Sequence, residues 1–237
     1  MMNKFSIVIP VFNEELNIDL LTDEIFMNLS MYNNFYEIIF VNDGSVDQTL
    51  SKIKYLNKKY PSVIRFIDNK KNIGQSLSLV EGIKSSKFKT IITIDGDGQN
   101  NPKDILILLK RYFSDSNLYL VGGIRYKRRD SFVKIVSSKL ANIIRGYFLK
   151  DNCPDTGCSL KVFDKDVFLE FPIFNGIHRF IPALFSGYGV KTYFINVDHR
   201  HRVHGYSKYG TFGRLFKGVN DLIRVAKIIK ELKRNPV

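Results

Sequence analysis

The segment from Thr90 to Pro102 constrains the fold most, because a β-favouring run ends there in two carboxylates. The run Ile91–Ile94 predicts a buried parallel strand. Asp95 and Asp97 would then lie at the carboxyl edge of a sheet, which is where open α/β sheets bind their ligands. Two oxygen ligands with little bulk between them suit a divalent cation that also contacts a diphosphate.

Two other structures begin with a sequence such as Asp95-Gly96-Asp97-Gly98: a solvated turn and an EF-hand calcium loop. An EF-hand loop requires Gly at its sixth position and Glu at its twelfth, where this chain has Asn100 and Leu106. The EF-hand is therefore excluded, whereas this segment alone leaves the solvated turn open. Asn101 as N-cap and Pro102 as first helical residue predict that the chain leaves the site as a helix.

The length of 237 residues suits one large α/β domain, and no linker rich in Pro, Gly and Ser divides the chain. We expect a domain over residues 1–210 and a helical segment over residues 211–237. The net charge of +13 predicts an anionic partner: nucleic acid, a phosphorylated substrate or an anionic membrane surface. Because the N-terminus runs into a strand pattern without a secretory signal, and no apolar run is long enough to span a membrane, we expect a cytoplasmic protein.

Strands alternate with helices through the first half of the chain, which predicts a mostly parallel sheet with right-handed crossovers. Three of the strands end in polar clusters, and these clusters converge on one crevice in a doubly wound sheet. The clusters are Asn13/Glu14, Asn42/Asp43 and Asp95/Asp97. The other predicted strands are Phe5–Ile9, Tyr36–Val41 and Ile64–Ile67, and the first helix is expected to bury Leu16, Leu20, Leu21 and Ile25.

Three motifs carry a resemblance to a known family: Ile9-Pro10-Val11-Phe12-Asn13-Glu14, Val41-Asn42-Asp43-Gly44-Ser45 and Asp95-Gly96-Asp97-Gly98-Gln99. They resemble the nucleotide-sugar motifs of family 2 glycosyltransferases, which have the A-type fold. Three later segments, 122–126, 155–160 and 201–209, are similar in the expected order to the dolichyl-phosphate mannosyltransferase-like branch, the polyprenyl-phosphate hexose synthases. The resemblance covers nearly the whole chain and implies a Rossmann-like sheet flanked by helices.

The resemblance implies a pocket for a nucleotide-sugar donor. In it, Pro10, Phe12 and Glu14 would line the base and ribose, and Asn42 and Asp43 would hold the base. Phe12 stands where many members of the family have Tyr, and Asn42 where many have a second Asp. Both departures change hydrogen bonding at the base, so the donor stays open between GDP-mannose and a UDP-hexose.

The implied chemistry is displacement of a nucleoside diphosphate from a sugar carbon. A divalent cation stabilises such a leaving group as a Lewis acid. The resemblance implies Asp95, Asp97 and Gln99 as ligands of Mg²⁺ or Mn²⁺, with Asp95 also contacting the donor. A polyprenyl phosphate acceptor is already an anion at neutral pH, so it needs neighbouring cations instead of a general base.

Cations for these phosphates are predicted in two segments. Arg125 follows the predicted strand Leu118–Val121, which makes it the best candidate for the acceptor phosphate. Arg202 and Lys208 are similar to the family's late pair, which closes over the diphosphate when substrate is present. The predicted catalytic set is therefore Asp97, Arg125, Arg202 and Lys208.

Two other functions are compatible with parts of the sequence. A family 2 transferase acting on a saccharide hydroxyl would need a general base, for which Asp155 is the candidate, although the resemblance places Asp155 in a structural turn. His178 could contact the acceptor or cap a helix, and the structural role is favoured because a lone His is weak evidence for a site. Nucleic-acid binding is disfavoured because the basic residues cluster in the later half of the chain and no nucleic-acid motif occurs.

The C-terminal segment has the pattern of a basic amphipathic helix, with charged residues off the apolar stripe. This pattern fits either a helix packed on the domain or one that lies on a membrane surface. We expect attachment to the inner face of the cell membrane through this surface, the lipid substrate or a small membrane partner protein. The apolar positions are Phe212, Leu215, Phe216, Val219, Leu222, Ile223, Ala226, Ile229 and Leu232.

Overall fold

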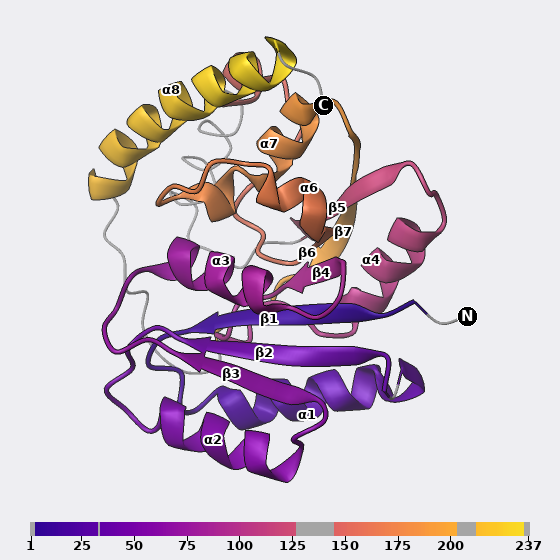
Figure 1. The fold of residues 1–237 in the computed structure, drawn as a ribbon, viewed down its shortest axis with the longest axis vertical. Helices are drawn as coiled ribbons and strands as arrows, with labels where there is room; N and C mark the ends of the chain where they lie inside the picture. The colour runs from indigo at the N-terminus through magenta and orange to yellow at the C-terminus, as the bar shows by residue number, and fades with distance from the viewer. Residues whose placement is uncertain (1–2, 33, 127–144, 203–211, 235–237) are drawn as a thin grey trace.

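A computed structural model describes residues 3–32, 34–126, 145–202 and 212–234, with residues 212–219 and 234 described by their backbone only. The described strands form one sheet with the order β3-β2-β1-β4-β6-β5-β7 (Figure 1). Strands β1 to β4 are parallel, β6 is antiparallel to both β4 and β5, and β7 is parallel to β5. The predicted mostly parallel sheet is therefore confirmed. The strands are β1 Phe5–Val11, β2 Tyr36–Asn42, β3 Ile64–Asp68, β4 Thr90–Thr93, β5 Leu118–Tyr126, β6 Lys161–Asp164 and β7 Lys191–Asp198.

Helices cover both faces of this sheet. They are α1 Ile18–Asn28, α2 Thr49–Lys59, α3 Gln75–Ser85, α4 Asp104–Phe113, α6 Lys165–Leu169, α7 Ile181–Tyr188 and α8 Phe212–Arg234, with short 3-10 helices η1 Ser30–Tyr32 and η2 Ile177–Arg179. Residues 145–149 add a helical turn. Of the helices in the described ranges, none combines the length and apolar character that crossing a bilayer requires.

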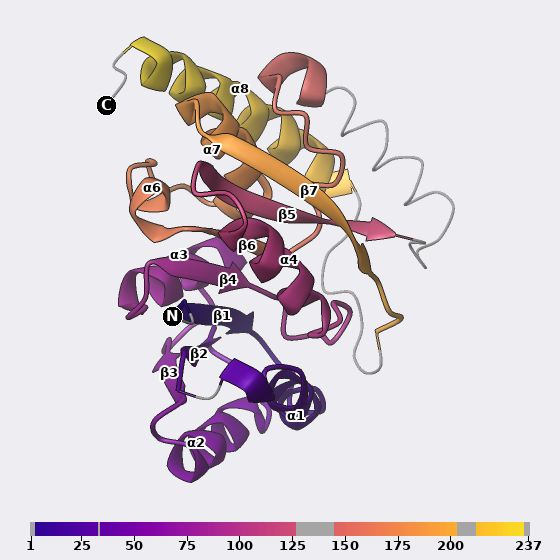
Figure 2. The ribbon, with the colours of Figure 1, turned by 90° about the vertical axis from the view of Figure 1, so that its right-hand side faces the viewer.

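The side chains of each strand point alternately to the two faces of the sheet, so the core has two layers, one on each face. Ile7 and Ile9 of β1 belong to the core layer that includes buried residues of α1, α2 and α4, whereas Val8 belongs to the layer that includes buried residues of α3, α6, α7 and α8. Figure 2 shows α4 on one side of the strands and α3 and α6 on the other. Because successive side chains of a strand point to opposite faces, a sheet buried on both faces needs the continuous apolar runs that this sequence has.

The first helix corrects one prediction. Leu16 and Leu20 were expected on its buried face, but they are 56% and 53% exposed. The helix begins at Ile18, and the side chains of Ile18, Leu21 and Ile25 face the core, which confirms the prediction for Leu21 and Ile25. These three positions follow the three-and-four spacing of one helix face, which Leu16 and Leu20 do not share with them.

Two element boundaries also differ from the predictions. The helix after β4 begins at Asp104 and not at Pro102. Asn101 instead forms a turn before the helix, in which its Oδ1 accepts the Lys103 N–H at 3.2 Å. Strand β5 continues to Tyr126, so Arg125 lies inside the strand and not directly after it.

The described part of α8 packs on α7, at the end of the molecule farthest from α1 and α2 (Figure 1). Val225, Ile228 and Ile229 are buried in this contact, whereas Ile223 is 53% exposed although it was predicted on the apolar face. A Cβ at Gly187 would lie 2.5 Å from Cγ1 of Ile229, so the two helices approach closely. The predicted face positions between residues 212 and 219 lie outside the described side chains.

Candidate active site

The loops after β1 and β2 are linked by side-chain hydrogen bonds. Asn13 has a positive φ of 53°, and its N–H donates to Oγ of Ser45 at 2.9 Å. Its own Oδ1 accepts the N–H of Val46 at 2.9 Å. The N–H of Glu14 donates to Oγ1 of Thr49 at 2.8 Å. These bonds hold the two loops of the predicted donor pocket beside each other, with Pro10 and Phe12 half-buried at the end of β1.

Asn42 and Asp43 are both buried at the end of β2. The carboxylate of Asp43 accepts the N–H groups of Ile73 at 2.8 Å and Gly74 at 3.0 Å, which fixes the loop before α3. The amide of Asn42 donates to Oδ1 of Asp68 at 2.7 Å. An Asp at position 42 would set two carboxylates against each other, so the pairing with Asp68 explains why this chain has Asn there.

Asp95 and Asp97 lie beside the end of β1. A Cβ at Gly96 would lie 2.5 Å from Cγ1 of Val11, so the close approach of this loop to β1 requires glycine. Gln75, the first residue of α3, donates from Nε2 to Oδ1 of Asp95 at 2.9 Å. The loop fixed by Asp43 thus delivers a side chain to Asp95, and the structure brings these parts of the predicted site together.

The electrostatics of this loop favour a bound cation. Burial, and then the charge of Asp97, raise the pKa of Asp95 to about 6, while Ser159, Lys161 and Arg125 act in the opposite direction. A divalent cation between the carboxylates would remove their repulsion. Within the described ranges, no group of three or more His, Cys, Asp and Glu side chains gathers as a metal site. The two carboxylates fit Mg²⁺ or Mn²⁺ of the kind that takes its other ligands from substrate phosphates and water.

Arg202 contacts this carboxylate pair directly. Its Nη2 lies 2.7 Å from Oδ2 of Asp97, whose Oδ1 accepts the N–H of Gln99 at 3.1 Å. The side-chain amide of Gln99 donates to the carbonyl of Arg200 at 3.4 Å, so it is turned toward the segment that carries Arg202. Lys208, the other member of the predicted late pair, lies outside the described residues.

Arg125 is held by a buried carboxylate. Its Nε and Nη2 donate to the two oxygens of Asp155, each at 2.8 Å, and its backbone N–H donates to Oδ2 at 3.1 Å. Asp155 is only 5% exposed. Strands β4 and β5 both pair antiparallel with β6, so Arg125 near the end of β5 lies at the same edge of the sheet as the loop that carries Asp95 and Asp97.

Three further residues of the site were not predicted from the sequence. Gln75 contacts Asp95 as described above, and Oγ of Ser159 accepts the N–H of Asp95 at 3.2 Å. Lys161 in β6 is buried, and its Nζ donates to the carbonyl of Cys158. Gln75 has a signal in the sequence, since it follows the Asn72-Ile73-Gly74 turn at a helix start, and Ser159 lies in the motif segment 155–160. Lys161 becomes recognisable only when β6 is placed next to β4.

His178 has a structural contact, as expected. Its Nδ1 lies 2.6 Å from Oγ of Ser76, which also accepts the N–H of Gly176 at 2.7 Å. Burial, with the charges of Arg179 and Lys161, lowers the pKa of His178 to about 3. The imidazole is therefore neutral at physiological pH and joins the start of α3 to η2.

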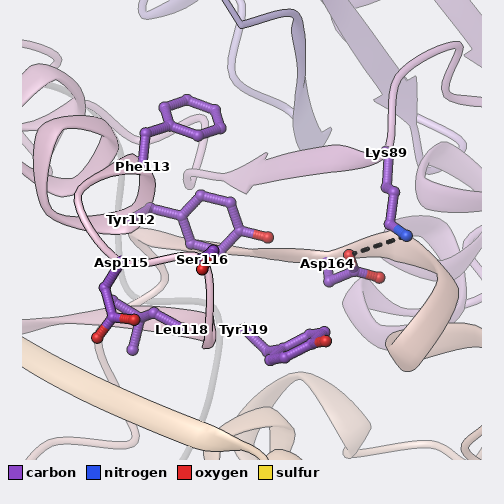
Figure 3. Close-up of a pocket in the computed structure, with 8 residues that line it drawn as sticks. All are labelled: Lys89, Tyr112, Phe113, Asp115, Ser116, Leu118, Tyr119 and Asp164. Atoms are coloured by element: carbon purple, nitrogen blue, oxygen red, sulfur yellow. Dashed lines mark ion pairs between the residues drawn. The ribbon is translucent and has the colours of Figure 1, made fainter.

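A separate pocket lies at the opposite edge of the sheet (Figure 3). It is lined by residues at the start of β5, such as Leu118, and at the end of α4, such as Tyr112. Lys89 pairs with Asp164 there at 3.5 Å. Because Lys89 precedes β4 whereas Asp95 follows it, this pocket is distinct from the candidate active site.

The architecture is that of the A-type glycosyltransferases. A mannosyltransferase from Pyrobaculum calidifontis, solved with GDP-Man and Mn²⁺, superposes with a TM-score of 0.65 at 15% identity over 94% of this chain and 65% of its own. Glucosyl-3-phosphoglycerate synthase from Mycobacterium tuberculosis, solved with Mn²⁺, UDP and phosphoglyceric acid, gives a TM-score of 0.67 at 16% identity over 94% of this chain and 77% of its own. These likenesses establish the fold.

The chain belongs to glycosyl transferase family 2, whose model matches residues 6–171. It is 32% identical over 94% of its length to a dodecaprenyl-phosphate galacturonate synthase from Rhizobium johnstonii, of which the match covers 66%. It is 30% identical over 92% of its length to an undecaprenyl-phosphate 4-deoxy-4-formamido-L-arabinose transferase from Pseudomonas aeruginosa, of which the match covers 63%. The chain thus spans just under two thirds of these relatives. The resemblance to the polyprenyl-phosphate sugar synthases is confirmed.

Proposed function

We propose that this chain transfers a hexose from a nucleotide-sugar donor to a polyprenyl phosphate. The observation that carries the proposal is the position of Arg125, which Asp155 holds at the edge of the sheet that also carries Asp95 and Asp97. The fixed guanidinium can bind the phosphate of the acceptor, and the carboxylate pair can bind the donor diphosphate through a cation. The named relatives act on dodecaprenyl and undecaprenyl phosphates, which supports this choice of acceptor.

The donor would bind along the ends of β1, β2 and β4. Pro10, Phe12 and Glu14 would line the base and ribose, with Asn42 and Asp43 beneath them. The hydrogen bonds that join the two loops support a pocket that is formed before the donor arrives. GDP-mannose and a UDP-hexose remain the two donor classes.

Asp95, Asp97 and Gln99 would hold Mg²⁺ or Mn²⁺ together with the donor diphosphate. The bound cation would supply Lewis-acid stabilisation of the leaving nucleoside diphosphate. Arg125 would hold the acceptor phosphate as a bidentate partner and orient one of its oxygens toward the sugar carbon. Because that oxygen is already ionised, a single displacement with inversion at the sugar carbon needs no proton transfer from the protein.

The alternative is transfer to a saccharide hydroxyl during synthesis of a cell-surface polysaccharide. Such an acceptor would need a general base, and Asp155 was the candidate. Both oxygens of Asp155 accept hydrogen bonds from Arg125, which favours a role in orienting that side chain. The contact therefore supports a phosphate acceptor over a hydroxyl acceptor.

We also propose that the chain lies on the cytoplasmic face of the membrane through α8. The described part of this helix exposes Arg224, Lys227, Lys230 and Lys233. Residues 1–100 carry 11 Lys and Arg against 12 Asp and Glu, so the positive charge comes from the later part of the chain. A basic helix surface suits an anionic lipid headgroup layer. A small membrane partner protein would add a second point of attachment.

The function is tested by incubating the purified chain with Mn²⁺, labelled GDP- and UDP-sugars and a short polyprenyl phosphate. We expect an acid-labile lipid product from one donor, and none from an oligosaccharide acceptor. Asp97→Asn should abolish the product, whereas Asp23→Asn, on the exposed side of α1, should leave it unchanged. Elongation of the oligosaccharide with no lipid product would favour the hydroxyl-acceptor alternative, and full activity of Asp97→Asn would refute the metal site.

A further inference from the structure

We propose that Arg202 competes with the divalent cation for Asp97, so that tight cation binding requires the donor diphosphate as a new partner for Arg202. This inference rests on the proposed metal site and assigns Arg202 a role before the donor is bound. It makes Arg202 a residue that couples the binding of cation and donor, in addition to any contact with the bound diphosphate.

The ion pair occupies an oxygen that the cation would use. Nη2 of Arg202 lies 2.7 Å from Oδ2 of Asp97, and the side chains are 25% and 12% exposed. Ion pairs shielded from water to this degree are stronger than pairs on an open surface. The N–H of Gln99 binds the other oxygen, Oδ1, at 3.1 Å, which orients the carboxylate with Oδ2 toward the guanidinium. Arg202 thus pairs with a carboxylate whose orientation is already fixed.

The segment that carries Arg202 is fastened to the metal loop. The N–H of Arg200 donates to the carbonyl of Gln99 at 2.9 Å, and Asn100 and His199 form an antiparallel bridge. The guanidinium of Arg200 also binds both oxygens of Glu24 in α1, at 2.7 and 2.9 Å. The backbone is therefore anchored at Arg200, two residues before Arg202. This anchoring places the Arg202 side chain beside Asp97.

A guanidinium and a divalent cation cannot both take the same carboxylate oxygen at full strength. A cation that arrives alone must displace Arg202 from Asp97 and leave a partly buried arginine without this partner, which weakens cation binding. A cation that arrives with a diphosphate brings oxygens to which a guanidinium can bind as a fork. Arg202 would then move from Asp97 to the diphosphate. Cation and nucleotide would therefore strengthen each other's binding, and the coupling must be reciprocal.

The first test measures Mn²⁺ binding to the full chain without nucleotide, from the electron paramagnetic resonance signal of free Mn²⁺. Arg202→Gln is expected to bind Mn²⁺ about tenfold more tightly than the unmodified chain, the factor that corresponds to one partly buried ion pair of 1.4 kcal/mol. Arg111→Gln is the control, since it removes a guanidinium that bonds Ser114 at the end of α4 and leaves the segment that carries Arg202 anchored. Its affinity for Mn²⁺ should be unchanged.

The second test repeats the titration with saturating UDP or GDP. The nucleotide should tighten Mn²⁺ binding by the unmodified chain. In Arg202→Gln, the ratio of Mn²⁺ affinities with and without nucleotide should be about tenfold smaller. Equal affinity of the unmodified chain and Arg202→Gln for Mn²⁺ alone would overturn the inference and leave the metal site standing. An equal gain in Arg111→Gln would also overturn it, by assigning the effect to the loss of a positive charge from the chain. No Mn²⁺ binding with or without nucleotide would overturn both this inference and the proposed function.

Discussion

Replacing Asp95 by Asn is expected to stabilise the folded protein in the presence of a chelator, although it removes a predicted metal ligand. Burial and the charge of Asp97 raise the pKa of Asp95 to about 6, from an ordinary value of 3.8. At pH 7.5 the folded state therefore carries a charge that it accommodates less well than the unfolded chain does. Asn is uncharged, and its side-chain oxygen can still accept the hydrogen bond from Gln75.

The magnitude follows from the raised pKa of Asp95. A carboxyl group that titrates near pH 6 in the folded state and near 3.8 in the unfolded state costs roughly 3 kcal/mol of stability at pH 7.5. Between these values the unfolded state binds fewer protons than the folded state, so stability falls as the pH rises. The gain from Asn should therefore be about half as large at pH 5 and should vanish below pH 4.

Urea denaturation with EDTA measures this gain at pH 7.5 and pH 5. For a chain of this length, 2–3 kcal/mol also corresponds to a rise in melting temperature of roughly 4–12 °C. Asp23→Asn on the exposed side of α1 is the control and should change stability by less than about 0.5 kcal/mol. A loss of stability in Asp95→Asn at pH 7.5, or a gain that is the same at both pH values, would refute the electrostatic reasoning.

Three other predictions follow from single contacts. Asp155→Asn should raise the KM for the lipid phosphate by about 10–100-fold by releasing Arg125, while nucleotide affinity from calorimetry stays unchanged; an unchanged KM would contradict this. Gly187→Ala should cost about 1–3 kcal/mol in urea denaturation, because the added Cβ meets Ile229; a neutral result would show that α8 packs loosely. The transfer rate at limiting Mn²⁺ should fall below about pH 6, where Asp95 is protonated; a rate that stays constant to pH 5 would argue against Asp95 as a ligand.

The first half of the fold was predictable because its signals are local. Each strand from β1 to β4 is a short apolar run followed by a polar loop and a helical pattern, and the structure has these strands within two residues of the predicted bounds. The error at Leu16 and Leu20 arose because a helix with apolar residues on several sides can bury more than one face. The sheet that the helix packs on decides which face is buried.

The second half was less predictable because its strands lack such signals. Strand β6 has only four residues and begins with Lys161, a charged side chain that the structure buries. Strand β7 lies at the edge of the sheet and buries only Val197 among its eight side chains, so no continuous apolar run marks it. Neither strand was predicted, and nor was the antiparallel position of β6 between β4 and β5.

The motif residues of the candidate site could be predicted from the sequence, but most of the contacts between the residues of the site could not. The motifs that contain Asp43, Asp95 and Asp97 could be found from sequence, because each follows a strand directly. The contacts that give the site its electrostatics join residues 20 to 105 positions apart, as in Gln75 with Asp95 and Arg202 with Asp97. Such pairs depend on the order of the strands in the sheet, which the sequence pattern alone does not determine.

The central claim is that Asp95 and Asp97 hold a divalent cation against the donor diphosphate. Anomalous diffraction at the manganese edge, from crystals grown with Mn²⁺ and a nucleoside diphosphate, tests it most directly. The account predicts one strong peak between the two carboxylates, in contact with phosphate oxygens, with the guanidinium of Arg202 no longer on Asp97. A nucleotide bound in the crevice without a manganese peak at these carboxylates would contradict the claim.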